Sequence, residues 1–150
     1  MQSFLASIIS IATNRFLLIP IGAMLAAQVI KFFYYSIRDR RIDFTMIYST
    51  GRMPSSHSAF VSSIVTLVGL HEGFGSILFA VSMVFALIVM YDATGIRRAA
   101  GKQAEVLNRI IDEMKAKKFV QGRLKEFLGH TPVEVHAGAL IGILIAVLFY

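Results

Sequence analysis

Four long apolar segments limit what this chain can fold into: Phe16–Ile37, Ala59–Leu70, Phe74–Tyr91 and Val135–Tyr150. They dominate a sequence of 150 residues that is 56% hydrophobic and only 16% charged. Because a bilayer core takes about 20 residues of helix, such runs predict membrane-spanning helices. The second and fourth runs are short, which is typical of helix starts buried inside a bundle or of a locally thinned bilayer. The sequence therefore predicts an all-α, polytopic membrane bundle of about four spanning helices, forming a single domain over residues 1–150.

Two further segments are predicted to be helical without spanning the bilayer. Met1–Thr13 is apolar but brief and lacks the basic region of a signal peptide, so we expect a short interfacial or partly inserted helix. Gly101–Lys118 places an apolar stripe opposite a charged face, which is typical of an interfacial helix lying on the membrane or over a site. A coiled-coil or partner-binding role has less support, because the stripe is short. Its interleaved acids and hydrophobic flanks speak against nucleic-acid binding.

The positive charges are distributed unevenly along these segments. If four spans are counted, fourteen of the fifteen Lys and Arg residues fall on one membrane side, and Arg15 alone falls on the other. The positive-inside rule places the basic side in the cytoplasm, so we expect an integral membrane protein whose basic loops face the cytoplasm. The following basic residues resemble ordinary loop charges and support the same orientation: Arg109, Lys115, Lys117, Lys118 and Lys125.

A proline, two serines and a histidine stand directly before the second apolar run, at Pro54, Ser55, Ser56 and His57. Proline presets the backbone of a first helical turn, and serine caps the amides that are unpaired there. A helix start attracts anions through its free N–H groups and its dipole, and histidine adds a proton donor near neutral pH. The motif therefore predicts a phosphate-binding helix start. Plain capping next to an unrelated histidine is the alternative.

Two cations at helical spacing mark the first apolar run. Lys31 interrupts it, and Arg38 follows two turns later on the same face as Gln28 and Tyr35. An ionisable group inside a span costs several kcal/mol unless it is paired or solvated. Lys31 therefore either extends to the lipid headgroups or, together with Arg38, lines an anion site reached from the cytoplasmic side.

The third run ends in a charged cluster formed by Asp92, Arg97 and Arg98, with a turn at Thr94–Gly95. Both arginines have a simple explanation as charges that complement a helix C-terminus on the basic side. Alternatively, Asp92 holds one arginine while a guanidinium fork grips phosphate oxygens. The spacing leaves open which arginine would do so.

The last run opens with His130 and Glu134, which are four residues apart. Thr131 and Glu134 form the capping-box pattern, with Pro132 at the first helical position, so Glu134 has a purely structural explanation. Across the same helix start, its carboxylate could instead accept a hydrogen bond from one ring nitrogen of His130. That bond would fix the tautomer and leave the other nitrogen free to attack. The two remaining histidines are assigned no role: His71 and His136.

Together these residues predict phosphate chemistry without a cofactor. The two histidines at helix starts, His57 and His130, would share the cytoplasmic level with four cations: Lys31, Arg38, Arg97 and Arg98. Phosphoryl transfer depends mainly on positioning and on charge stabilisation of the phosphate oxygens, so such a cluster needs no metal. The sequence has no concentration of carboxylates suited to magnesium, and it has no cysteine for a thiolate site or a disulfide. We therefore expect neither a metal nor another cofactor.

These motifs resemble the signature of the type 2 phosphatidic acid phosphatases, and more closely a divergent bacterial and plant branch of that family, which is related to vanadium-dependent haloperoxidases. The first part of the signature, Lys-x6-Arg-Pro, resembles Lys31 to Arg38 with Asp39 in place of the proline. The second part, Pro-Ser-Gly-His, resembles Pro54 to His57 with a serine in place of the glycine.

The third part of the signature, Ser-Arg-x5-His-x3-Asp, is matched only at its end, by His130 and by Glu134 in place of the aspartate. No arginine stands at the expected offset, since Arg123 is one residue too early and has no preceding serine. Arg97 or Arg98 is the better substitute, because the segment around them itself resembles the divergent branch. For that branch the resemblance covers nearly the whole chain.

The resemblance implies a phosphatase that works through a phosphohistidine. His130 would attack phosphorus, Glu134 would orient it, and His57 would protonate the leaving oxygen. Asp92 would support an arginine. The residues that would hold the phosphate are Lys31, Arg38, Arg97 or Arg98, Ser55 and Ser56.

The implied substrate is a lipid phosphate that enters from the cytoplasmic leaflet: phosphatidate, phosphatidylglycerophosphate, or an isoprenyl phosphate or diphosphate. Membrane lipids are the expected surroundings, nucleic acid is not an expected partner, and the small size is compatible with a homodimer. A non-enzymatic protein that binds anionic headgroups through the same cations is the main alternative. A haloperoxidase with vanadate in the phosphate pocket fits the related chemistry but not a small membrane chain.

Overall fold

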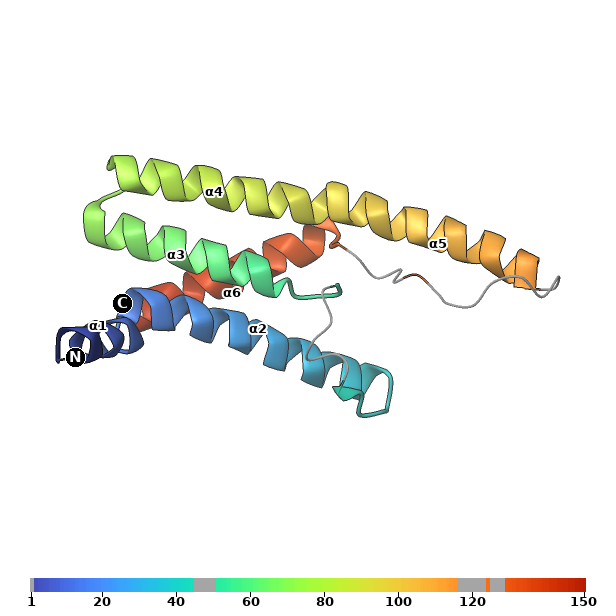
Figure 1. The fold of residues 1–150 in the computed structure, drawn as a ribbon, viewed down its shortest axis with the longest axis horizontal. Helices are drawn as coiled ribbons and strands as arrows, with labels where there is room; N and C mark the ends of the chain where they lie inside the picture. Colours follow the sequence, from blue (N-terminus) through green and yellow to red (C-terminus); the bar gives the residue numbers. More distant parts are fainter. Residues whose placement is uncertain (1, 45–50, 116–123, 125–128) are drawn as a thin grey trace.

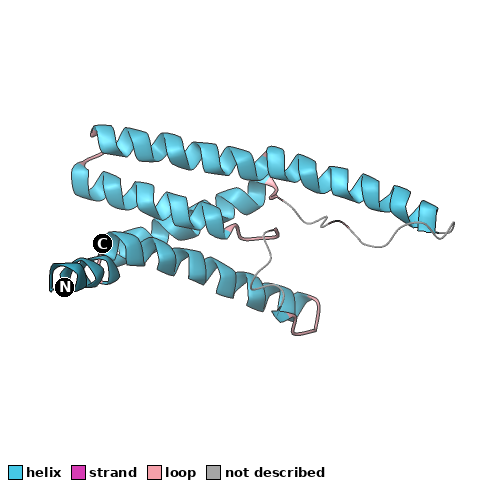
Figure 2. Ribbon diagram, viewed as in Figure 1, coloured by secondary structure: helices cyan, strands magenta, loops and turns pink. Residues whose placement is uncertain are grey.

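The regular elements in the computed structural model are all helices (Figures 1 and 2). In chain order they are α1 (Gln2–Ala12), α2 (Arg15–Arg38), α3 (Ser56–Glu72), α4 (Ile77–Thr94), α5 (Ile96–Lys115) and α6 (Pro132–Phe149). The structure describes residues 2–44, 51–115, 124 and 129–150.

The predicted apolar runs all lie in helices, and side-chain caps explain where those helices begin. Ser76 precedes α4, and its hydroxyl accepts a hydrogen bond from the Phe79 amide. This cap makes α4 start at Ile77, three residues after the predicted apolar run Phe74–Tyr91 begins. Thr131 caps α6 in the same way, so α6 starts before its apolar run. Asn14 caps α2 and separates it from the short α1.

The central helix of the bundle is α3, which packs against α2, α4 and α6 (Figure 1). More than half of its residues are buried, and many of these are small or polar. Ser62 shows how such a helix satisfies its hydroxyls, because its Oγ donates to the Ala139 carbonyl of α6 across 3.0 Å. The core of the protein is therefore built around a helix of small residues rather than around large aliphatic side chains.

Two glycines of α6 let its backbone approach α3 very closely. A Cβ atom on Gly138 would collide with the backbone of Ser55, and one on Gly142 would collide with the Ala59 carbonyl and the Ser62 hydroxyl. Small residues four apart are a common basis for tight helix packing in membranes. This approach holds the starts of α3 and α6 side by side.

Within the described residues, three helices are long and apolar enough to cross a membrane: α2, α4 with its continuation into α5, and α6. By contrast, α3 has only 17 residues, fewer than the roughly 20 that cross a bilayer core. The predicted membrane character is thus found in three helices, and the predicted count of about four spanning helices stays a prediction for α3.

The amphipathic helix differs from its prediction in where it begins. It begins at Ile96 rather than Gly101, directly after Gly95, which ends α4. It prolongs α4 in nearly the same direction (Figure 1). Its first turns border the candidate site, as predicted, and the rest extends away from the bundle, so its expected place on the membrane surface stays a prediction. Its apolar residues Val106, Leu107 and Ile110 are exposed.

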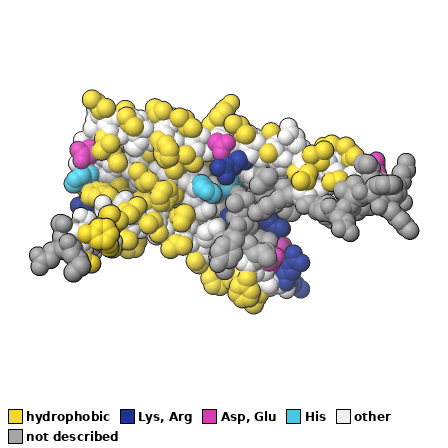
Figure 3. All heavy atoms as spheres, in the orientation of Figure 1, with side chains coloured by type: hydrophobic (Ala, Val, Ile, Leu, Met, Phe, Trp, Pro, Cys, Tyr) yellow, Lys and Arg dark blue, Asp and Glu magenta, His cyan; other side chains and the backbone are white. Residues whose placement is uncertain are grey.

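Apolar and basic side chains separate on the surface. Hydrophobic side chains cover the bundle in Figure 3, whereas Lys and Arg gather mainly beyond it, toward α5 and the end of α2. The exposed large apolar residues belong largely to α2, α4 and α6, as expected for helices that face lipid. Four basic residues named in the sequence analysis lie outside the described residues: Lys117, Lys118, Arg123 and Lys125.

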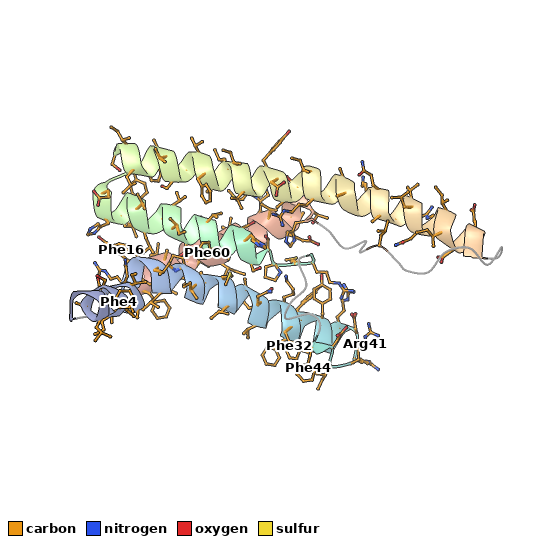
Figure 4. The ribbon with its side chains drawn as sticks, viewed as in Figure 1. Phe4, Phe16, Phe32, Arg41, Phe44 and Phe60 are labelled. Atoms are coloured by element: carbon orange, nitrogen blue, oxygen red, sulfur yellow. The ribbon has the colours of Figure 1, made fainter. Side chains whose placement is uncertain are left out.

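The chain turns back on itself where α2 ends. Phe44 stacks on Phe32 of α2 with ring centroids 5.8 Å apart, and Figure 4 shows the two rings together beside Arg41. This contact folds residues 39–44 back against the last turns of α2, close to where Arg38 and Asp39 form an ion pair.

We expect Gly142→Ala to destabilise the bundle, because its new Cβ meets the Ala59 carbonyl of α3 and the helices must separate. Overpacking of this kind costs about 1–3 kcal/mol, which would lower the temperature at which the protein aggregates in detergent. Gly22→Ala is the matched control, since a Cβ there meets nothing within 4 Å. Equal heat stability of the two variants would contradict the close α3–α6 contact.

Candidate active site

A cavity of about 710 Å³ opens among the basic ends of the helices. Its lining residues come from α2, from the segment before α3, from α5, and from the start of α6. They are Tyr35, Arg38, Gly51, Arg52, Arg98, Gly101, Lys102, Glu105, Gly129, His130, Thr131 and Glu134. Four of the predicted site residues therefore share one cavity: Arg38, Arg98, His130 and Glu134.

One carboxylate oxygen of Glu134 serves both the fold and the site. Its Oε2 lies 3.2 Å from His130 Nδ1 and also accepts a 3.0 Å hydrogen bond from the Thr131 amide. The Thr131 hydroxyl accepts in turn from the Glu134 amide, which completes a capping box. Because an ionised carboxylate only accepts, the hydrogen-bond network assigns the proton to Nδ1 and leaves Nε2 with its lone pair. Capping and orientation of His130 are therefore not alternatives.

The backbone before α6 fixes where His130 stands. The His130 amide donates a 2.9 Å hydrogen bond to the Ala93 carbonyl at the end of α4. Gly129 has a φ of 85°, and a Cβ there would collide with the backbone of Arg97 and Arg98. Only glycine meets both requirements, so the chain can dock tightly on the α4–α5 junction. This docking brings His130 and Arg98 to the same cavity.

His130 is buried, with 3% of its surface exposed, which places it at the floor of the cavity. Burial lowers the pKa of His130, and the charges of Lys31 and His57 act in the same direction, while the Glu134 carboxylate raises it. The lowered pKa favours the neutral ring at pH 7, the form in which a histidine is a nucleophile.

Lys31, His57 and Arg97 adjoin His130 without lining the cavity. Lys31 is fully buried in the bundle, so it does not extend to the headgroups. It lies close enough to Glu134 and to both histidines for their charges to interact. Arg97 likewise acts electrostatically on His57, which is exposed at the start of α3. Segments far apart in the sequence thus bring two imidazoles and two cations together.

Ser55 of the serine motif forms hydrogen bonds within the protein. The Ser55 amide donates to the Glu134 carbonyl across 3.0 Å, and its Oγ accepts hydrogen bonds from the amide and the hydroxyl of Ser58. Ser55 is the N-cap of α3, and Ser56 is its first residue and is buried. Pro54 precedes the cap rather than presetting the first turn, which corrects that part of the prediction. Ser55 therefore ties the start of α3 to the start of α6.

The end of α2 carries an arrangement that the sequence analysis did not predict. Tyr35 has two guanidinium groups near its ring, those of Arg38 at 4.6 Å and Arg52 at 4.8 Å from the centroid. Both arginines pair with Asp39, at 2.9 Å for Arg38 Nε and 3.8 Å for Arg52 Nη1. The Tyr35 hydroxyl accepts from the Met53 amide. The only available signals were the helical spacing of Tyr35 from Lys31 and the position of Arg52 just before the serine motif.

The adjacent arginines Arg97 and Arg98 have different surroundings. Asp92 pairs with Arg97 across 2.6 Å, whereas Arg98 lines the cavity. Lys102 stands one turn after Arg98 on α5 and lines the same wall, and the sequence analysis gave it no role. Within the described residues, no three His, Asp or Glu side chains gather as a metal site would require.

Comparison with known proteins places the chain in a family. It is 48% identical over 145 residues to the uncharacterized membrane protein YuiD of Bacillus subtilis (strain 168), an alignment that covers 89% of this chain and 92% of the relative. No solved structure matches it. Residues 12–145 match the family described as "Divergent PAP2 family". With so much of the chain matched, the protein belongs to the Divergent PAP2 family, as its motifs led us to expect.

Proposed function

We propose that this membrane protein is a metal-independent phosphatase that hydrolyses a lipid phosphate through a phosphohistidine at His130. The observation that supports the proposal most strongly is the hydrogen bond between His130 Nδ1 and the Glu134 carboxylate in a cation-lined cavity. A histidine whose tautomer is fixed by a carboxylate, beside a second histidine and buried positive charge, has the parts that phosphoryl transfer needs.

In the first step, Nε2 of His130 attacks phosphorus and the ester P–O bond breaks. His57 gives its proton to the leaving alcohol oxygen, while Glu134 stabilises the positive charge that develops on the His130 ring. In the second step, water attacks the phosphohistidine, His57 takes a proton from that water, and the P–N bond breaks to release inorganic phosphate. His130 ends in its starting state.

Positive charge on three sides would stabilise the phosphate oxygens during both steps. We assign this role to Lys31, to Arg38 and to Arg98, with the Ser56 amide at the start of α3 as a further donor. Arg97 is held by Asp92, and its positive charge acts electrostatically on His57. Ser55 acts by positioning, because a direct phosphate contact would compete with the hydrogen bonds that it already forms.

The location of the site supports a lipid substrate, because α2 and α6, which are long and apolar enough to cross a membrane, border the cavity. Following the resemblance in the motifs, we propose phosphatidate, phosphatidylglycerophosphate or an isoprenyl phosphate or diphosphate as the substrate. The site faces the cytoplasm, with α3 as a fourth, short crossing, and the membrane is the bacterial cytoplasmic one. A homodimer is compatible with this arrangement.

Binding of anionic headgroups without turnover is the competing function. One observation favours it: binding requires only exposed cations such as Arg98 and Lys102, whereas catalysis requires access to His130, of which 3% is exposed. Release of phosphate separates the two functions, because a binder keeps its affinity for the lipid and leaves it intact.

We expect His130→Ala to reduce phosphate release from lipid phosphates to background, because the attacking nitrogen is lost. The measurement is inorganic phosphate released in detergent from a panel of these lipids. Activity of the wild type should resist EDTA and be inhibited by vanadate. His136→Ala is the matched control, since His136 lies in the first turns of α6, shortly after His130, but lines a different pocket. Normal turnover by a folded His130→Ala protein would remove the nucleophile assignment.

Replacing Glu134 with Gln should lower kcat roughly 10- to 100-fold, the usual cost of losing a partner that orients a functional histidine. Because the carboxylate raises the pKa of His130, its loss lets the ring deprotonate at lower pH, so the acid limb of the kcat/KM profile should move to lower pH. Thr131→Val removes the helix cap without removing charge and should leave the acid limb in place. A wild-type rate and profile in Glu134→Gln would mean that Glu134 only caps α6.

Single cysteines test the topology, because the natural chain contains none. A cysteine in place of Arg109 on α5 should react with an impermeant maleimide only after the cytoplasmic side is opened. One in place of Glu72, at the end of α3, should react in intact cells. Both replaced side chains are exposed, at 74% and 48%. If the Glu72 cysteine reacts only from the cytoplasmic side, α3 does not cross the membrane.

A further inference from the structure

The cavity carries more positive charge than one phosphate needs. Besides the residues around His130, four cations line it, and we name them the outer cation group: Arg38, Arg52, Arg98 and Lys102. They come from α2, from the segment before α3, and from α5, so they face the cavity from different sides. In the mechanism above, Arg52 and Lys102 have no role.

The acidic residues in and beside the cavity are largely engaged by other partners, as Glu134 is by His130. Asp39 is shared between Arg38 and Arg52. Glu105 lines the cavity, but its Oε1 is held by Arg109 across 2.6 Å. In the described part of the chain, Arg98 and Lys102 form no ion pair. Since they are four residues apart on α5, they lie on one face of the helix and present two positive charges side by side.

The lining residues differ in their exposure. His130 is 3% exposed, whereas Arg98 and Lys102 are exposed on the same cavity. The volume of about 710 Å³ is that of a pocket for a sizeable ligand and far exceeds what a single phosphate fills. A ligand whose terminal phosphate reaches His130 must therefore place its next groups among these cations.

We propose that the outer cation group binds a second phosphate, with Arg52 and Lys102 dedicated to it and Arg38 and Arg98 shared with the phosphate at His130. The preferred substrate is then a lipid diphosphate whose terminal phosphate lies at His130. This inference rests on the proposed function and narrows its substrate class. Arg52 and Lys102 are the residues that discriminate a diphosphate from a monophosphate. Arg52 is suited to this role because the Tyr35 ring and Asp39 hold its guanidinium in place.

The chemistry of the step differs from ester cleavage in its leaving group. Nε2 of His130 forms a bond to the terminal phosphorus, and the bond from that phosphorus to the bridging oxygen breaks. The bridging oxygen keeps the electron pair, so the lipid monophosphate leaves with the additional negative charge, and water then releases inorganic phosphate from His130. A phosphate is a far better leaving group than an alcohol, so cations that stabilise it replace much of the proton donation by His57.

The test compares farnesyl diphosphate with farnesyl monophosphate in the same detergent, measuring kcat/KM for phosphate release. The wild type should prefer the diphosphate by at least about tenfold, the effect of one good charge-assisted hydrogen bond. Arg52→Gln and Lys102→Gln should each reduce the diphosphate value about tenfold more than the monophosphate value. Arg41→Gln is the matched control: it removes a neighbouring cation that does not line the cavity, and the ratio should stay at its wild-type value.

A second comparison probes the leaving group independently. His57→Gln should reduce kcat/KM for the monophosphate at least about tenfold more than kcat/KM for the diphosphate. This parameter reports the transfer of phosphate to His130, a step in which only the alcohol requires the proton of His57, and not the later hydrolysis of the phosphohistidine that both substrates share. Each variant must elute as the wild type does in size exclusion.

Two outcomes would overturn the proposal while leaving the phosphatase intact. One is a wild type that hydrolyses the monophosphate as well as the diphosphate. The other is an equal loss for both substrates in Arg52→Gln and Lys102→Gln, which would mean that these cations only attract anionic lipids. If the wild type releases phosphate from neither substrate nor from any glycerophospholipid, the phosphatase assignment itself fails.

Discussion

The close contact between α3 and α6 is the constraint on which the rest of the structure depends. Gly138 and Gly142 remove the side chains that would separate the two backbones, and the Ser55 amide then reaches the Glu134 carbonyl. Because both helices begin at this contact, the histidine at each start is brought to the same level of the bundle. With larger side chains at Gly138 and Gly142, both helices would still form, but α6 could no longer pack against α3 in this position. Packing of small residues thus determines where the polar chemistry lies.

Glu134 links the fold to the chemistry through a single oxygen. Its Oε2 accepts from the Thr131 amide, which caps α6, and from the His130 ring, which it orients. The burial that makes this carboxylate effective also lowers the pKa of His130. The nearby Lys31 is fully buried, and the opposite charge of Glu134 helps to offset the cost of burying its charge. The stability of the helix start and the state of the proposed nucleophile therefore rest on the same atoms.

Local patterns in the sequence predicted the helices well, because apolar length, capping residues and charge asymmetry are properties of short segments. The cap at Thr131 and the spacing of His130 from Glu134 could be read directly, whereas the serine motif indicated a capped helix start but not that Ser55 is the cap. Long-range geometry could not be predicted in this way. Lys102 carries no local signal and Arg52 has only its position before the serine motif, and both line the cavity because distant segments border it together: α2, the segment before α3, α5 and the start of α6. The direction of α5 is likewise not predictable from local patterns, because a single Gly95 between two helices does not indicate whether the chain bends.

The central claim is that phosphate passes through a covalent bond to His130, and trapping that bond tests it most directly. The wild type would be mixed with a lipid phosphate, quenched in alkali after a fraction of a turnover, and mapped by mass spectrometry. We expect a phosphoryl group on the peptide that contains His130 and its accumulation when hydrolysis of the intermediate is slowed. Phosphate release with no phosphorylated protein at any quench time, or a phosphoryl group on His57 instead, would exclude His130 as the nucleophile.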